Sequence, residues 1–245
     1  CYMPKKIILD YDNCPPNADA TIESIRSLGY DLGIAVSDII DNSISAGANT
    51  IWIYYEWKEA DSYISIIDNG KGMQEKELIE AMRLGTISPT EKRDEKDLGR
   101  FGLGLKTASF SQCRILTVRT KQKSGSSVRK WDLNHVNKVN DWQLLKSTND
   151  ASDKIMDQKL NTLSTGTVVL WQNLDRLITL DDEDENNQEY FYNKISSLRE
   201  YLGMIFHRYL AGPKSIKIIL SPDCTEDDKE YKIAPWDPFI TANSF

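Results

Sequence analysis

The sequence predicts an α+β fold, a two-layer α/β sandwich in which helices cover one face of a mixed, mostly antiparallel sheet. Residues 50–56 and 62–68 are rich in β-branched and aromatic side chains, and a short polar linker joins them, which is typical of an antiparallel hairpin. From residue 113 onward the pattern is mainly strand-like. Because neighbouring strands have short links and the helices carry apolar stripes, a sheet covered by helices satisfies both signals.

Helices are expected where apolar residues recur at helical spacing. Ile22, Ile25 and Leu28 mark a helix over 17–30, and a second helix over 31–46 ends near Gly47. The polar stretches 85–97 and 146–165 are expected to be loops. The remaining helices are expected over 74–83, 103–111 and 187–211, and the remaining strands over 114–120, 127–133, 142–145, 167–171 and 214–220.

The composition is that of a globular domain with a core, because 40% of the 245 residues are hydrophobic and 27% are charged. The sequence has no apolar run of about 18 residues and no signal-peptide pattern, so we expect no membrane partner and a cytoplasmic location. The net charge of −7 disfavours a surface that coats nucleic acid, which other domains of a longer protein remain free to bind. The four cysteines lack the spacing of a zinc site, and two histidines are too few for a histidine-based metal site.

The first candidate motif lies on the second predicted helix. Asp38, Asp41 and Asn42 stand at i, i+3 and i+4, so they share one helix face. Two carboxylates and an amide on one face suit a cleft that holds a hydrated Mg²⁺ ion, which prefers oxygen ligands. A solvent-exposed polar face explains the same residues without a ligand.

The second candidate motif follows the strand over 62–68 directly. Asp68 ends that strand and is positioned to present its carboxylate to a cleft, while Gly70 and Gly72 let the backbone approach a flat ligand before Met73. A plain turn is the alternative, because Asp-Asn-Gly is a common turn sequence.

The third candidate motif is a glycine-rich turn that precedes a helix. Amides at such a helix start bind anions, and a nearby lysine adds positive charge. The pattern is neither a Walker nor a Rossmann motif. A fourth signal, Thr167 at the start of a strand, has an ordinary strand start as its alternative. The third motif comprises Gly99, Arg100, Phe101, Gly102, Leu103 and Gly104, followed by Lys106 and Thr107.

Taken in order and spacing, these four signals resemble the GHKL ATPase superfamily, which includes gyrase B subunits, the heat-shock chaperone, histidine kinases, MutL and MORC proteins. The stretch AVSDIIDNSISAGA is similar to the first motif of that family, and SIIDNGKGM is similar to the second. The stretch DLGRFGLGLKTASF resembles the third, in a form nearest to MORC-like and related prokaryotic ATPases. The resemblance covers roughly residues 30–175 and implies the Bergerat fold, with ATP and Mg²⁺ bound.

The resemblance also implies a role for each matched residue on the base side of the site. Asn42 would bind the Mg²⁺ ion that bridges the phosphates. Asp68 would accept a hydrogen bond from the adenine amino group, and Thr167 would support the adenine through Asp68 and water. Gly72 would leave room for the base and orient a water, with Gly70 and Met73 beside it.

On the phosphate side, the resemblance implies that the backbone amides of residues 99–104 wrap the phosphates. Lys106 would neutralise phosphate charge, and Thr107 follows it. Residues 85–98 would be a lid that closes on ATP. The domain boundaries that follow are an irregular segment at 1–16, the ATP-binding domain at 17–233, and a linker at 234–245 toward a transducer or partner domain.

The chain departs from the family at the general base. The ATP-hydrolysing branches have Glu where this chain has Asp38, and Asp is one methylene shorter. A misplacement of about 1 Å costs on the order of 100-fold in rate, so we expect ATP binding with slow hydrolysis, weakest in an isolated domain.

The leading functional prediction is an ATP-driven conformational switch that forms a homodimer when ATP is bound. A nucleotide sensor that binds without turnover is the alternative, and Asp38 is the reason for it. A histidine kinase is disfavoured, because residues 1–29 contain no His to accept a phosphoryl group. The client of the switch is left open.

Overall fold

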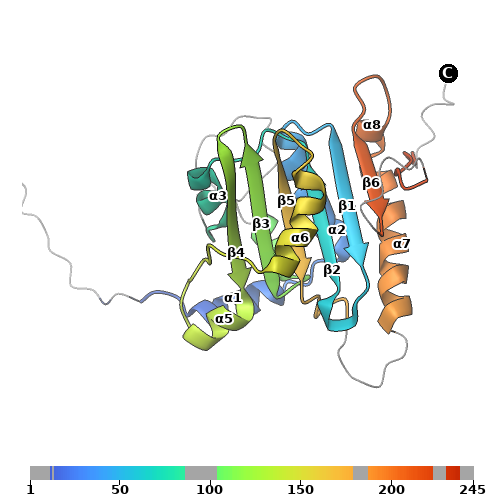
Figure 1. Ribbon diagram of the computed structural model, residues 1–245. Coiled ribbons are helices and arrows are strands. Elements are labelled where there is room, and N and C mark those ends of the chain that lie inside the picture. Colours follow the sequence, from blue (N-terminus) through green and yellow to red (C-terminus); the bar gives the residue numbers. More distant parts are fainter. Residues whose placement is uncertain (1–11, 13, 86–103, 179–186, 223–229, 238–245) are drawn as a thin grey trace, which may run out of the picture.

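The computed structural model describes residues 12, 14–85, 104–178, 187–222 and 230–237. Helices and strands alternate irregularly along the chain, which confirms the predicted α+β class (Figure 1). The helices are α1 (Ala18–Arg26), α2 (Leu32–Ser45), α3 (Glu75–Met82), α4 (Gly104–Phe110), α5 (Leu133–Val139), α6 (Asp150–Leu160), α7 (Asn187–Ile205) and α8 (His207–Leu210), with a short 3₁₀ turn η1 (Glu59–Asp61). The strands are β1 (Thr50–Glu56), β2 (Tyr63–Asp68), β3 (Ile115–Gln122), β4 (Gly125–Asp132), β5 (Gly166–Gln172) and β6 (Lys217–Ser221).

The six strands form one mixed sheet in the order β4-β3-β5-β2-β1-β6. All neighbours are antiparallel except β1 and β6, which are parallel. The predicted hairpin over 50–56 and 62–68 is confirmed as β1 and β2, with Tyr55 opposite Ile64. The predicted mixed, mostly antiparallel sheet is therefore confirmed.

The larger hydrophobic core lies between one face of the sheet and the layer that contains α2, α4 and α7. Sheet residues that alternate along their strands, such as Ile64 and Ile66 in β2, point into this core and are at most 2% exposed. The helices contribute Ile39 and Ile40 from α2 and Phe191 from α7. Burial of these side chains, at roughly 1.5–3 kcal/mol each, fixes α2 over the sheet.

A second, smaller core lies on the opposite face of the sheet, beneath α6 (Figure 1). Met156 and Leu160 of α6, one helical turn apart, pack on Val168 and Leu170 of β5. Residues 146–165 were predicted to be a loop, and this prediction is wrong over α6. The prediction failed because only a narrow apolar stripe on an otherwise polar helix meets the sheet.

Two further element predictions need correction. Residues 142–145 were predicted to be a strand, but Leu145 makes only an isolated bridge to Lys130 of β4. The long helix predicted over 187–211 is interrupted at Phe206, whose ψ of 14° separates α7 from α8. None of the helices described is both long and apolar enough to cross a membrane.

Candidate functional site

Three polar side chains from adjacent strands form a row at one end of the sheet. Asp68 is the last residue of β2 and lies opposite Thr167 of β5, which in turn lies opposite Thr120 of β3. Because side chains alternate along a strand, these three share the face that carries α2. The predicted residues Asp68 and Thr167, 99 positions apart in sequence, are therefore neighbours.

Asp68 is a buried carboxylate held by hydrogen-bond donors. Its side chain accepts hydrogen bonds from the Gly70 amide at 2.7 Å and from the Ser43 hydroxyl of α2 at 3.2 Å. Burial raises the pKa of Asp68 to about 6, against the opposing effect of hydrogen bonds from Gly70, Ser43 and the Thr167 backbone. At neutral pH the group is thus ionised and able to accept a further hydrogen bond.

The loop after Asp68 passes so close to other backbone that its glycines have no room for side chains. A Cβ on Gly70 would lie 3.0 Å from the carbonyl oxygen of Ala46 at the end of α2. A Cβ on Gly72 would lie only 2.3 Å from the Lys121 carbonyl oxygen, and Gly72 also has a φ of +66°. The two glycines are therefore required by tight packing between α2 and β3.

The predicted acidic face of α2 lies beside the start of α4. Asp38 is half-buried, and a Cβ on Gly104 would lie 3.6 Å from its Oδ2 atom. Burial raises the pKa of Asp38, and burial followed by the Asp38 charge raises the pKa of Asp41. Asn42, one residue before the Ser43 that contacts Asp68, is exposed. The first motif therefore adjoins both the second motif and the first residue of α4.

Lys106 and Thr107 lie inside the protein rather than on the surface. Lys106 is 2% exposed, and its Nζ donates a hydrogen bond to the carbonyl oxygen of Ala81 in α3 at 2.8 Å. Burial lowers the pKa of Lys106 to about 8. A role for Lys106 in neutralising phosphate stays a prediction. Of the predicted lid at 85–98, residues 86–98 lie outside the described residues, as do Gly99, Arg100, Phe101, Gly102 and Leu103.

Two site residues were missed by sequence analysis. Ser43 donates to the Asp68 carboxylate, and the Thr120 hydroxyl accepts a hydrogen bond from the Met73 amide at 2.7 Å. Ser43 directly follows Asn42, which was a usable signal. Thr120 carried no local signal, because its partner is 47 positions away in sequence.

The residues present fit Mg²⁺ only as one part of a larger ligand set. No group of three or more His, Cys, Asp or Glu side chains comes together within the described parts of the chain. The side-chain oxygens of Asp38 and Asn42 are of the kind that Mg²⁺ prefers, but this ion needs six oxygen ligands. Waters and a polyphosphate would have to supply the rest.

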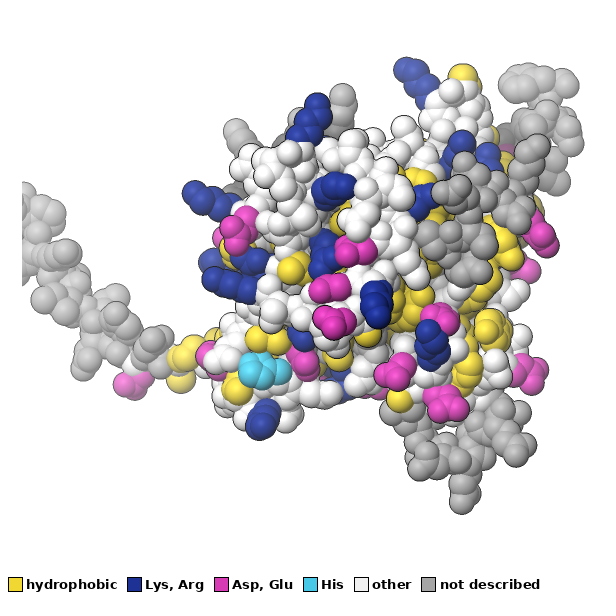
Figure 2. Space-filling model, viewed as in Figure 1, with side chains coloured by type: hydrophobic (Ala, Val, Ile, Leu, Met, Phe, Trp, Pro, Cys, Tyr) yellow, Lys and Arg dark blue, Asp and Glu magenta, His cyan; other side chains and the backbone are white. Residues whose placement is uncertain are grey.

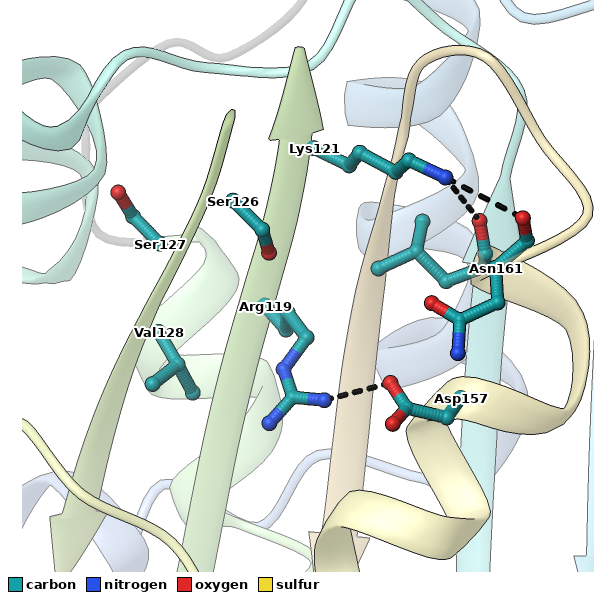
Figure 3. Close-up of a pocket in the computed structure, with 8 residues that line it drawn as sticks. Arg119, Lys121, Ser126, Ser127, Val128, Asp157 and Asn161 are labelled. Carbon is teal, nitrogen blue, oxygen red and sulfur yellow. Dashed lines mark hydrogen bonds and ion pairs between the residues drawn. The ribbon is translucent and has the colours of Figure 1, made fainter. Parts of the chain in front are cut away.

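A separate hollow of about 320 Å³ lies on the opposite face of the sheet, between α6 and the β3–β4 hairpin (Figure 3). Its charged groups are paired with protein atoms: Arg119 with Asp153 and Asp157 of α6, and Lys121 with the carbonyl oxygens of Leu160 and Asn161. Basic and acidic side chains intermix on this face (Figure 2). The hollow is not continuous with the Asp68 row, which faces α2.

Comparison with known proteins gives matches to the stretch of the chain that contains the Asp68 row. A family model described as histidine kinase-, DNA gyrase B-, and HSP90-like ATPase matches residues 30–167, more than half of the chain. The chain is 33% identical over 99 residues to the mismatch repair endonuclease pms1 of Dictyostelium discoideum, and 33% identical over 100 residues to the DNA mismatch repair protein MutL of Thermodesulfovibrio yellowstonii. Each alignment covers 38% of this chain, and they cover 10% and 18% of the two relatives. A special likeness to MORC proteins is not confirmed.

Proposed function

Because the chain belongs to the histidine kinase-, DNA gyrase B-, and HSP90-like ATPase family, we propose that it binds ATP together with Mg²⁺ on the face of the sheet beneath α2. The observation that carries this proposal is the buried carboxylate of Asp68. This carboxylate is ionised at neutral pH and accepts hydrogen bonds from three donors. It stands at the end of β2, below α2, which carries further oxygen ligands.

Asp68 suits the adenine amino group for a specific reason. A buried carboxylate can only accept hydrogen bonds, and the adenine amino group can only donate them. A guanine would place its carbonyl oxygen at the same point and be repelled. Sites built on such buried polar pairing reject the wrong partner strongly, because mispairing leaves buried groups without partners.

Calorimetric titration with Mg-ATP tests the proposal directly. We expect saturable binding by the wild type and a loss of at least 100-fold in affinity in Asp68→Asn, whose amide repels the adenine amino group. Asp61→Asn removes the same charge from the exposed η1 turn and serves as the matched control. Wild-type affinity in Asp68→Asn would place the nucleotide elsewhere.

For hydrolysis we propose that Asp38 is the general base. It lies on α2 beside Gly104, and burial raises its pKa, which makes its carboxylate a stronger base than that of an exposed aspartate. Its short side chain supports slow turnover. We expect Asp38→Asn to abolish turnover while leaving ATP affinity within about threefold, and Asp38→Glu to raise kcat.

A binding-only sensor is the second candidate function, and the same Asp38 residue favours it. Single-turnover measurement with radiolabelled ATP separates the two functions. Release of phosphate that depends on Asp38 supports the ATPase, whereas bound ATP that stays intact over hours supports the sensor.

We further propose that ATP drives a conformational switch with ATP-dependent homodimerisation. Both relatives are named for DNA mismatch repair, and the chain aligns with only a small part of each. Sedimentation with and without a non-hydrolysable ATP analogue tests dimerisation. An unchanged monomer with saturated nucleotide would refute the dimer while leaving nucleotide binding intact.

A further inference from the structure

We propose that the Thr120 hydroxyl is a positioning group that fixes the base-side walls of the nucleotide site and thereby sets its preference for adenine over guanine. The inference rests on the proposed ATP binding and adds a residue that lies outside the matched motifs. Thr120 acts through Met73 and Thr167 rather than by touching the nucleotide.

Thr120 connects two segments that border the proposed site and are far apart in the sequence. Thr120 is fully buried in β3, between the loop after β2 and the start of β5. Its Oγ1 atom accepts a hydrogen bond from the Met73 amide at 2.7 Å. The same atom lies 3.3 Å from the Gly166 carbonyl oxygen and 3.3 Å from the Thr167 Oγ1 atom.

The protons on these hydroxyls limit what Thr167 can present to a ligand. A hydroxyl has one proton and two lone pairs, and the Met73 amide occupies one lone pair of Thr120. If Thr120 donates to the Gly166 carbonyl, its second lone pair accepts the Thr167 proton, and Thr167 faces the ligand as an acceptor. If Thr120 donates to Thr167 instead, the Thr167 proton is free. Removal of the Thr120 hydroxyl abolishes both arrangements.

The Thr120 hydroxyl also fixes the position of the loop after β2 relative to Asp68. Gly72, next to Met73, lies against the carbonyl oxygen of Lys121, and Gln122 donates a hydrogen bond to the Gly72 carbonyl oxygen at 3.3 Å. The Gly70 amide of the same loop binds Asp68. When the loop loses its hydrogen bond to Thr120, the position of the Asp68 carboxylate, which discriminates between purines, therefore changes as well.

The chain offers a matched control on the same strand. Thr117 is also fully buried in β3, but its Oγ1 atom has no hydrogen-bond partner in the described part of the protein. It lies opposite Leu170, whose side chain belongs to the core beneath α6. Thr117→Val and Thr120→Val are the same isosteric change, and only the second removes a hydrogen-bonded hydroxyl.

The test measures Mg-ATP and Mg-GTP affinity by calorimetry for the wild type, Thr120→Val, Thr120→Ser and Thr117→Val. We expect Thr120→Val to weaken ATP binding about tenfold and to lower the ATP-over-GTP selectivity at least fivefold. Thr120→Ser keeps the hydroxyl and should remain within about twofold of wild type on both measures, as should Thr117→Val. A smaller fraction of folded protein lowers the apparent affinities for ATP and GTP by the same factor, so it cannot by itself change the selectivity.

Unchanged selectivity in Thr120→Val, or a Thr120→Ser variant as defective as Thr120→Val, overturns the inference. Absence of ATP binding by the wild type instead overturns the proposed function. If Thr120→Val is unfolded at the assay temperature, Thr120→Cys replaces it, because a thiol is a much weaker hydrogen-bonding group of similar size. Wild-type selectivity in Thr120→Cys would then overturn the inference.

Discussion

Replacement of Asp68 by Asn is expected to stabilise the nucleotide-free protein while destroying its site. The pKa of Asp68 is raised from 3.8 to about 6, so the ionised group costs the folded state about 3 kcal/mol relative to the unfolded chain. The carbonyl oxygen of the Asn side chain still accepts the hydrogen bond from the Gly70 amide, but its NH₂ group takes the place of the second carboxylate oxygen. The lost hydrogen bond at that position costs about 1 kcal/mol. At pH 7.5 the net gain for Asp68→Asn is about 2 kcal/mol.

The sign of the pH dependence follows from the raised pKa. The stability that protonated Asp68 contributes is fully present below pH 3.8 and is lost as the pH rises through about 6. Relative to wild type, Asp68→Asn should therefore gain about 2 kcal/mol between pH 4.5 and 7.5. Urea unfolding at these two pH values measures the difference, with Asp61→Asn as the control for a change of net charge. A variant less stable than wild type at pH 7.5, or a difference independent of pH, refutes the reasoning.

Three further predictions concern the stability of the folded protein. Arg26→Met should lower the free energy of unfolding in urea by about 3–5 kcal/mol, because two carbonyl oxygens and the Asp175 carboxylate lose the partner that binds them at 2.8, 2.8 and 2.5 Å. Arg83→Met, at an exposed arginine, should change this free energy little. Between pH 8 and 10.5 the free energy of unfolding of the wild type should rise by up to about 3 kcal/mol relative to that of Lys106→Met, because the unfolded lysine binds its proton more tightly than the folded one. A difference between the two proteins that does not change with pH contradicts this. Gly72→Ala should lower the melting temperature well beyond Gly47→Ala, since both have a positive φ but only Gly72 meets backbone; equal effects would contradict the clash.

Much of the fold was predictable because its strands and main helices carry strong local patterns. The segment TIWIYYE is β1 at the predicted bounds, and α2 begins one residue after its predicted start because Asp31 caps it by accepting the Gly33 amide. The helix α6 was not predictable from apolar spacing, because Ser152, Met156 and Leu160 are its only buried residues. Its start was signalled by Asn149, whose side chain accepts the Ser152 amide.

The candidate site was predictable where a motif is local and unpredictable where contacts join distant strands. Asp68 and Gly72 stand in one short motif, and the reason for Gly72 became clear only when β3 was seen against it. Thr120 of β3 contacts Met73 in the loop after β2 and Thr167 of β5, and the order of these strands in the sheet differs from their order in the sequence. No pattern within a single segment records such a contact.

The anchoring of the end of α3 has a consequence for how the chain tolerates insertions. Lys106 of α4 binds the carbonyl oxygen of Ala81, and the Trp131 indole of β4 binds that of Met82, both at 2.8 Å. The points where the chain leaves α3 and enters α4 are thus tied together by groups that lie outside the connection. Doubling the length of a connection with fixed ends costs only about 0.6 kcal/mol in closure entropy. We therefore expect the end of α3 and the start of α4, and with them Asp38 and Asp68, to keep their places when the length of the chain between them is changed.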